Sequence, residues 1–275
     1  MGTLRMRREP YWLHMLLLAG AVATIFPFLW MISTSLKQVQ DVYELVPTLI
    51  PRVWRWENYP EVVARVPFAR MYLNTIMTAA ARTLGEVGFA AMAGYAFARI
   101  RFPGRHALLV AILAVLMIPP QVTMVPNYIF IKDLGWLDSY QGIVVPRLWS
   151  AYGTFLFRQF FLSMPEELVD ASRIDGCIPP RAFLHVALPL AQPVIAAFGF
   201  LSLLYAWNDF LWPLIVIQST KMNVLAVGVS FFQDQNTTNF PLTMAASSMA
   251  IVPVLFVFAL AQRHFVEGIT LTGLK

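Results

Sequence analysis

The chain has 275 residues, of which 58% are hydrophobic and 13% are charged, and its formal net charge is +5. Its mean hydropathy is +0.63. Because a soluble globular domain carries about a quarter charged residues, this composition indicates a polytopic membrane protein. The positive charge does not favour a nucleic-acid partner, because the basic residues lie mostly at the ends of apolar runs, where topology and lipid headgroups explain them.

Several kinds of chemistry are missing from the sequence. The single cysteine, Cys177, excludes an intrachain disulfide, and the four histidines are scattered without metal-ligand spacing. The chain has no glycine-rich phosphate loop and no nucleophile elbow. It therefore predicts a non-enzymatic protein with no metal or cofactor of its own, and any energy from ATP must enter through another chain.

The first apolar run covers residues 11–36 and follows a basic N-terminus. A signal peptide is the alternative, since Ala21-Val22-Ala23 resembles a cleavage site, but the run exceeds the roughly 7–15 residues of a signal core. A first transmembrane helix is the better interpretation. The proline-rich segment 37–70 then predicts an extracytoplasmic loop, with Trp54 and Trp56 suited to the membrane interface.

The second predicted span, residues 71–98, contains two charges, Arg82 and Glu86. Their i, i+4 spacing places them on one face of a helix, where they can form an ion pair. Such a pair should not face lipid. Two interpretations stay open: a neutralised structural pair inside the bundle, or a pair that lines a cavity or a gate.

The third predicted span, residues 107–130, follows a short basic loop and is interrupted by prolines. Proline removes a backbone donor and breaks a helix, and a broken helix at membrane depth is tolerated where it lines a cavity or is buried in protein. Gln121, Asn127 and Tyr128 are therefore candidate pathway residues. Alternatively, the helix ends here and these residues lie at the outer interface.

Three further spans are predicted at residues 141–161, 186–206 (continued to about 217) and 243–261. Six spans place both termini on one side of the membrane. Arginine and lysine are concentrated in the tails and short loops of that side, so the positive-inside rule places the termini and the loop 158–185 in the cytoplasm.

The segment 165–193 is the most charged short stretch of the chain. Its charges cannot lie in lipid. Glu166 and Glu167 predict the start of a short helix that Gly176 interrupts. A structured cytoplasmic loop of this kind is typical of a docking site for another protein.

Within this segment, "EELVDASRIDG" followed by nine residues and "VALP" resembles the EAA loop of ABC-importer permeases. Asp170-Ala171-Ser172 matches the Glu-Ala-Ala triplet, Gly176 the glycine, and Val186-x-Leu188-Pro189 the final Ile-x-Leu-Pro. Asp170 is shorter than the usual glutamate. Four further motifs, at 94–105, 155–168, 207–214 and 268–274, are similar to the smaller permease of carbohydrate-uptake importers of the maltose and glycerol-phosphate type.

The resemblance implies an all-α, six-helix type I importer fold in a single transmembrane domain, 1–275, with a coupling loop at 162–189. It implies a bacterial or archaeal inner-membrane location and a carbohydrate, polyol or sugar-phosphate substrate. The partners would be a second homologous permease, two ATPases that bind ATP and Mg, and an extracytoplasmic solute-binding protein. The residues expected to couple to the ATPase are Glu167, Asp170, Ala171, Ser172, Arg173, Asp175, Gly176, Leu188 and Pro189. The resemblance leaves two interpretations of the C-terminal tail open: a further ATPase contact, or a frayed polar end.

Alternatives remain for three other residues. Trp207 and Asn208 either face the pathway, where a ring stacks on sugars and an amide bonds hydroxyls, or anchor and cap a helix end. Arg147 is a candidate for binding a substrate phosphate or, alternatively, an interfacial residue at the end of the fourth span. An ion-coupled secondary transporter is the competing function, but it predicts several acidic residues inside spans, and only Glu86 clearly qualifies.

Overall fold

A computed structural model of the chain describes residues 11–174, 176–233 and 238–272. The secondary structure of these residues is helical, apart from one isolated antiparallel bridge between Gln233 and Thr238. The chain divides into two compact units, Met1–Val66 with Val229–Ile251, and Pro67–Gly228 with Val252–Lys275. Helix α15 (Phe240–Thr272) contributes to both units.

The first unit is built on α1 (Tyr11–Ser35), in which only Thr34 and Ser35 are buried. Most of its other side chains are apolar and exposed, as expected of a helix that lies in lipid. The loop after α1 contains α2 (Val39–Val42) and α3 (Asn58–Arg65). It is folded against the end of α1, because the buried Asn58 side chain donates to the carbonyls of Ser35 (2.8 Å) and Lys37 (3.0 Å).

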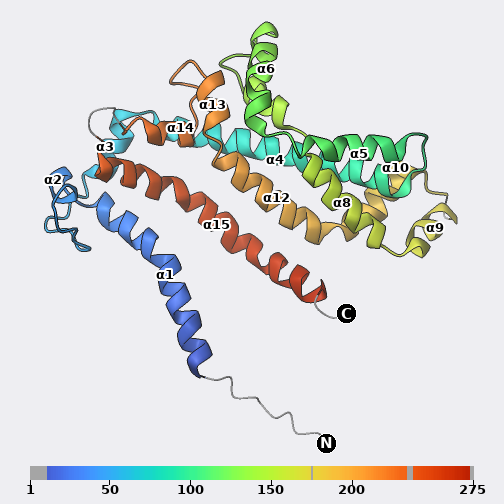
Figure 1. Cartoon of the computed structure of the whole chain (residues 1–275), viewed down its shortest axis with the longest axis horizontal. Helices are drawn as coiled ribbons and strands as arrows, with labels where there is room; N and C mark the ends of the chain where they lie inside the picture. Colours follow the sequence, from blue (N-terminus) through green and yellow to red (C-terminus); the bar gives the residue numbers. More distant parts are fainter. Residues whose placement is uncertain (1–10, 175, 234–237, 273–275) are drawn as a thin grey trace, which may run out of the picture. The chain divides into compact units, whose positions relative to one another are not determined.

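The second unit is organised around α4 (Phe68–Arg99), a helix of 32 residues. It packs along α8 (Ala151–Ser163) and α12 (Gln192–Trp207), as Figure 1 shows. Small residues of α4 meet large aromatic ones in the core between these helices, which is the usual way that helices approach closely in lipid. The buried members of this core are Ala90, Ala91, Tyr95, Ala98, Phe157, Phe161, Met164, Ala187, Ala191 and Phe198.

Gly94 marks the closest approach of α4 to α8. A Cβ at this position would lie 2.6 Å from Cβ of Phe157 and 2.8 Å from the backbone nitrogen of Arg158. We expect Gly94→Ala to destabilise the folded chain by about 1–3 kcal/mol, since backbone must move to admit the methyl group. Gly88→Ala is the matched control on the same helix, because a Cβ there meets nothing within 4 Å. Thermal unfolding in detergent measures the stability of both variants. Equal melting temperatures would contradict the close contact of α4 with α8 at Gly94.

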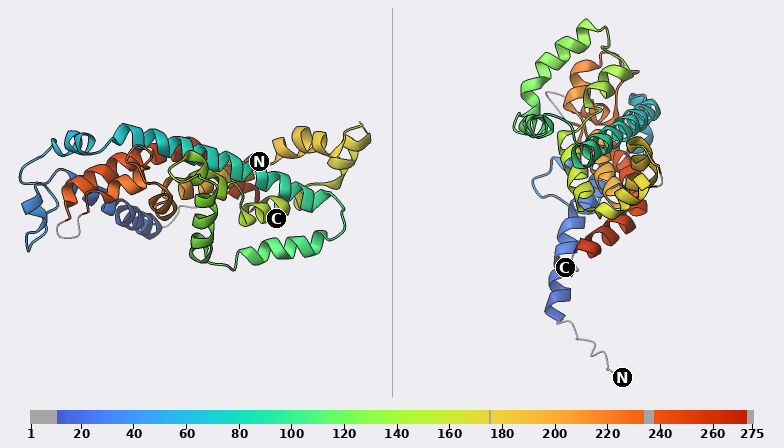
Figure 2. Two further views of the ribbon diagram at one scale, coloured as in Figure 1. Left: turned by 90° about the horizontal axis from the view of Figure 1, so that it is seen from above. Right: turned by 90° about the vertical axis from the view of Figure 1, so that its right-hand side faces the viewer.

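Two of the predicted spans are sharply bent. α5 (Arg105–Val115) and α6 (Pro120–Asp133) form an angle of 98°, and the segment Pro179–Leu190 meets α12 at 79° (Figure 2). The first bend lies at the prolines that predicted it. Two described helical stretches, Tyr11–Ser35 and Phe240–Leu260, are long and apolar enough to cross a membrane, and up to four candidate spans result if each bent pair is one span.

The predicted fourth span, 141–161, is not one continuous helix. This region contains α7 (Tyr140–Val144), a 3-10 turn η1 (Val145–Arg147) and then α8. Pro146 lacks the amide donor that a continuous helix needs, and the Ser150 hydroxyl caps the new helix by accepting from the Gly153 amide at 3.0 Å. The fifth predicted span is also divided, because α12 ends at Trp207 and α13 (Leu211–Val216) begins after a break.

Asp138 joins the loop after α6 to the loop after α13. Its backbone has a φ of 54°, and its Oδ1 accepts from the amides of Gln218 (3.0 Å) and Ser219 (2.9 Å) and from the Ser219 hydroxyl (3.0 Å). Burial acts to raise the pKa of Asp138, but these hydrogen bonds outweigh it and hold the pKa below the ordinary 3.8. The carboxylate form is therefore the one that stabilises the fold.

We expect Asp138→Asn to lower stability by about 1 kcal/mol at pH 7, because a charge-assisted acceptor becomes a neutral one. Asparagine tolerates the left-handed backbone, so strain does not contribute. The contribution of Asp138 is complete above its ordinary pKa of 3.8 and is lost as the pH falls through its lower folded value. The wild-type and variant melting temperatures should therefore converge in acid. The exposed Asp133, replaced by asparagine, is the control and should change little at any pH.

Candidate coupling segment and helix-break cavity

The predicted coupling loop contains a helix, α9 (Glu166–Ile174), that carries Glu167, Asp170, Ala171, Ser172 and Arg173. The side chains of Glu167 and Ala171 are exposed. Gly176 follows with a φ of 77° and nothing within 4 Å of an added Cβ. Glycine is therefore favoured here by the left-handed backbone conformation and not by a lack of space for a side chain. Asp175 lies outside the described residues.

The chain returns from this turn to the core through three short elements, α10 (Pro179–Ala182), the π-helix η2 (Phe183–Ala187) and α11 (Leu188–Leu190). Leu188 is partly buried and packs against the core that contains Phe157 and Phe198, whereas Pro189 is exposed. Of these two predicted coupling residues, Leu188 therefore anchors the segment in the core.

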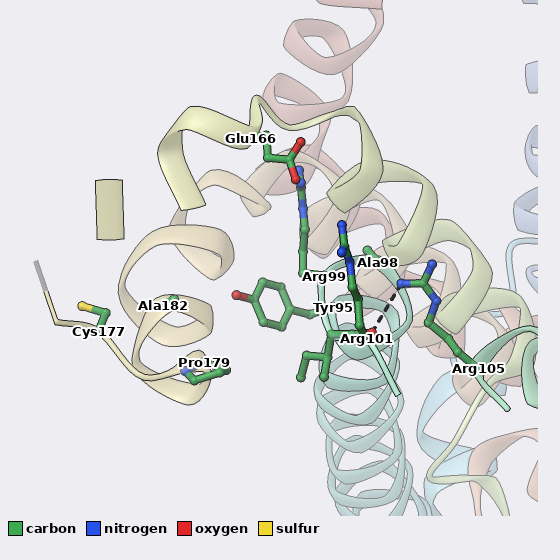
Figure 3. A pocket seen from close by; sticks show the side chains of 10 residues that line it. Tyr95, Ala98, Arg99, Arg101, Arg105, Glu166, Cys177, Pro179 and Ala182 are labelled. Atoms are coloured by element: carbon green, nitrogen blue, oxygen red, sulfur yellow. Dashed lines mark hydrogen bonds between the residues drawn. The ribbon is translucent and has the colours of Figure 1, made fainter. Parts of the chain in front are cut away.

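A cavity of about 510 Å³, here called the basic cavity, lies beside this segment. Figure 3 shows Arg99, Arg101 and Arg105 on one side of it and Cys177, Pro179 and Ala182 on the other. The Arg99 guanidinium donates to the Met164 carbonyl at 2.5 Å, immediately before α9 begins. Two motifs that are separate in the sequence, 94–105 and the coupling loop, thus meet at the base of α9.

A second cluster, here called the Arg82 network, connects α4 to α12 and to the break that follows α12. Arg82 donates through Nε to Glu86 and through Nη1 to Asp209, both at 2.9 Å. The Ser202 hydroxyl on α12 donates to the other oxygen of Glu86 at 2.6 Å. All three charged side chains are less than 20% exposed, with values of 14%, 10% and 18%.

The ion pair between Arg82 and Glu86 has the geometry that the i, i+4 spacing predicts. Sequence reasoning missed Asp209 as the second partner of Arg82. A signal was available, because Asp209 is an acidic residue enclosed by two apolar runs, a situation that calls for a buried cation nearby.

A cavity of about 740 Å³, here called the helix-break cavity, opens beside this network. Its polar lining is Arg82, Arg147, Asn208 and Asp209, and its apolar lining is Leu201, Leu204, Tyr205, Phe210 and Leu211. Asn208 also ends α12, since its side-chain amide donates to the Leu204 carbonyl at 2.9 Å. The capping and the cavity-lining interpretations of Asn208 are therefore compatible in this geometry.

The other predicted pathway residues lie apart from both cavities. Trp207 is 8% exposed and packs edge-on against Tyr72, with ring centroids 6.3 Å apart. Gln121 and Asn127 are exposed on α6, and Tyr128 packs against the small core around Ile131 and Trp212. The structure thus brings Asn208, but not these four residues, next to the charged network.

Comparison with known proteins identifies the family to which the chain belongs. The family model of the binding-protein-dependent transport system inner membrane component matches residues 87–270, and the chain belongs to this family. It is therefore a permease component of an ABC importer and not itself the catalytic subunit.

Individual relatives are similar over almost the full length. The sn-glycerol-3-phosphate transport system permease protein UgpE of Pectobacterium atrosepticum is 34% identical over 93% of this chain and 94% of the relative. The UgpE protein of Rhizobium meliloti is 35% identical over 94% and 95%. A crystal structure of a bacterial ABC transporter involved in the import of the acidic polysaccharide alginate has a chain with the same fold, with a TM-score of 0.81 at 24% identity over 92% of this chain and 94% of that one. None of these comparisons supports an ion-coupled transporter.

Proposed function

We propose that this chain is one of two homologous permeases of a bacterial inner-membrane importer for a carbohydrate, a polyol or a sugar phosphate. It would cross the membrane six times as one transmembrane domain, 1–275, with both termini in the cytoplasm and the loop 37–70 outside. The distribution of basic residues supports this topology. The names of the UgpE relatives support the substrate class.

Helix α9 is the proposed contact with an ATPase partner. The observation that carries this proposal is its attachment: the Arg99–Met164 hydrogen bond fixes its beginning, and Leu188 fixes the returning chain in the core. Between these two points, α9 exposes Glu166, Glu167 and Ile174, of which Ile174 is 86% exposed. A helix that is held at its base and exposes side chains near both of its ends is suited to transmit a rigid-body movement.

The movement would continue along the chain to the helix-break cavity. From α9 the backbone passes through α10, η2 and α11 directly into α12, and α12 ends at Asn208 and Asp209. Because Asp209 is bonded to Arg82 on α4, a displacement of α12 has to move or break that ion pair. ATP binding and hydrolysis in the partner chains would thereby alternate access to the pathway.

Reconstitution tests this function. The chain, its partner permease and its ATPases are placed in proteoliposomes with the solute-binding protein, and uptake of labelled polyols, sugars and their phosphate esters is measured with and without ATP. Uptake should require ATP and the ATPase. Uptake by this chain alone, driven by an ion gradient, would contradict the proposal.

A further inference from the structure

We propose that Arg147 is the residue of the helix-break cavity that selects an acidic cargo, a polyol or sugar that carries one phosphate or carboxylate group. This inference rests on the proposed function and names the substrate class for the same pathway. It follows from how the four polar side chains of the cavity are already engaged.

Arg82 is not available for a ligand. Two of its nitrogen donors are bonded to Glu86 and Asp209, and its side chain is 14% exposed. Both carboxylates are in turn paired with Arg82, and Glu86 also accepts from Ser202. The charged groups of the Arg82 network are therefore bonded to one another. Because two carboxylates share one guanidinium, the network carries one excess negative charge.

Arg147 is the second arginine of the cavity, and its N–H donors are free to bind a ligand. Among the side chains that the structure describes, it forms no ion pair and no hydrogen bond. Its guanidinium carbon instead lies 5.7 Å from the ring centroid of Trp212. Stacking on an aromatic face leaves the edge of a guanidinium, with its five N–H donors, free for a planar oxyanion.

Trp212 is a rigid support for this arginine. Its ring is 1% exposed and its indole nitrogen donates to the Gly142 carbonyl at 3.0 Å. The guanidinium is thus held in place before a ligand arrives, which lowers the entropy lost on binding. The excess negative charge of the neighbouring network attracts the Arg147 guanidinium without occupying its donors.

The remaining lining defines the rest of the ligand. Asp209 accepts hydrogen bonds from hydroxyl groups but repels a bare oxyanion, so inorganic phosphate alone should bind poorly. Tyr205 is 72% exposed and offers an apolar ring face to a carbon skeleton. A small molecule with an acid at one end and hydroxyls at the other satisfies Arg147 and Asp209 together.

Equilibrium binding to the complete importer in nanodiscs, with no solute-binding protein present, tests the inference. The probes are sn-glycerol 3-phosphate, glycerol and inorganic phosphate. The wild type should bind the ester most tightly. Arg147→Met should weaken binding of the ester about tenfold or more and that of glycerol less than about twofold. Arg147→Lys, which keeps the charge but loses the planar fork, should fall between the two.

The control is Arg70→Met, which removes an exposed arginine of the same unit that donates to the Lys221 carbonyl outside the cavity. Equal loss of both probes in Arg147→Met, a preference of the wild type for glycerol, or no binding of the ester would each overturn the inference. Uptake in proteoliposomes distinguishes failure of this inference from failure of the proposed function. If ATP-driven uptake persists but does not depend on Arg147, only this inference fails; if the wild-type assembly shows no ATP-driven uptake, the proposed function fails.

Discussion

Replacing Arg82 with methionine should destabilise the folded chain by about 3–5 kcal/mol, the cost of removing one partner from a buried ion pair. Glu86 and Asp209 would both lose their cation while remaining 10% and 18% exposed. Glu86 is enclosed between α4 and α12, where Ser202 donates to it, whereas Asp209 keeps contact with the helix-break cavity. The loss of stability therefore comes mainly from uncompensated charge, because methionine replaces most of the arginine's volume.

Two further variants distinguish this explanation from a packing defect. The triple variant Arg82→Met, Glu86→Gln, Asp209→Asn removes the charges together and should recover most of the lost stability. Arg65→Met removes an exposed arginine that is paired with Glu61, and it should cost at most about 1 kcal/mol. The stability of Arg82→Met, of the triple variant and of Arg65→Met is measured from their melting temperatures in detergent. The explanation is wrong if Arg82→Met and Arg65→Met behave alike, or if the triple variant is as unstable as the single one.

Replacing Gly176 with valine should reduce ATP-driven uptake about tenfold or more while leaving the melting temperature nearly unchanged. A β-branched residue strongly disfavours the φ of 77° that this turn adopts. Because an added Cβ meets nothing within 4 Å, the turn can relax without a clash. The relaxation would redirect α9, and with it the surface proposed to contact the ATPase.

Backbone conformation and side-chain size can be separated at this position. Gly176→Asn tolerates a left-handed backbone and should retain more uptake than Gly176→Val. Gly135→Val introduces the same residue into another turn, with a φ of 69° and equally open surroundings, but in the loop after α6. It should leave the ratio of uptake to ATP hydrolysis unchanged. Co-purification of the ATPase with each variant shows whether docking itself is lost. Equal uptake by all three variants would exclude a coupling role for the turn.

The features predicted well from the sequence are local ones. The ion pair of Arg82 with Glu86 depends on a spacing of four residues, and the start of α9 and the turn at Gly176 depend on neighbouring residues. The break between α5 and α6 lies where prolines remove backbone donors. Each of these follows from rules that act within one or two helical turns.

The features that were missed depend on long-range contacts. Asp209 is 127 residues from Arg82 in the sequence, so no periodicity connects them. The interruption between η1 and α8 was hidden by apolar residues that fit a continuous span equally well. Arg147 lies in the 3-10 turn η1, and only the fold shows that its neighbour is the ring of Trp212 and that it lines a cavity with Asp209.

The exposure of α1 determines which amino-acid substitutions this helix can accept. Between Tyr11 and Leu29 no side chain is buried by the rest of the chain, and none makes a hydrogen bond or ring contact with another described element, so no such neighbour constrains the shape of these residues. Only their hydropathy matters to a bilayer. Exchanges among leucine, isoleucine, valine and phenylalanine along this helix should be close to neutral, whereas Gly94 tolerates no such drift. The family model, which begins at residue 87, likewise leaves this first helix outside the shared pattern.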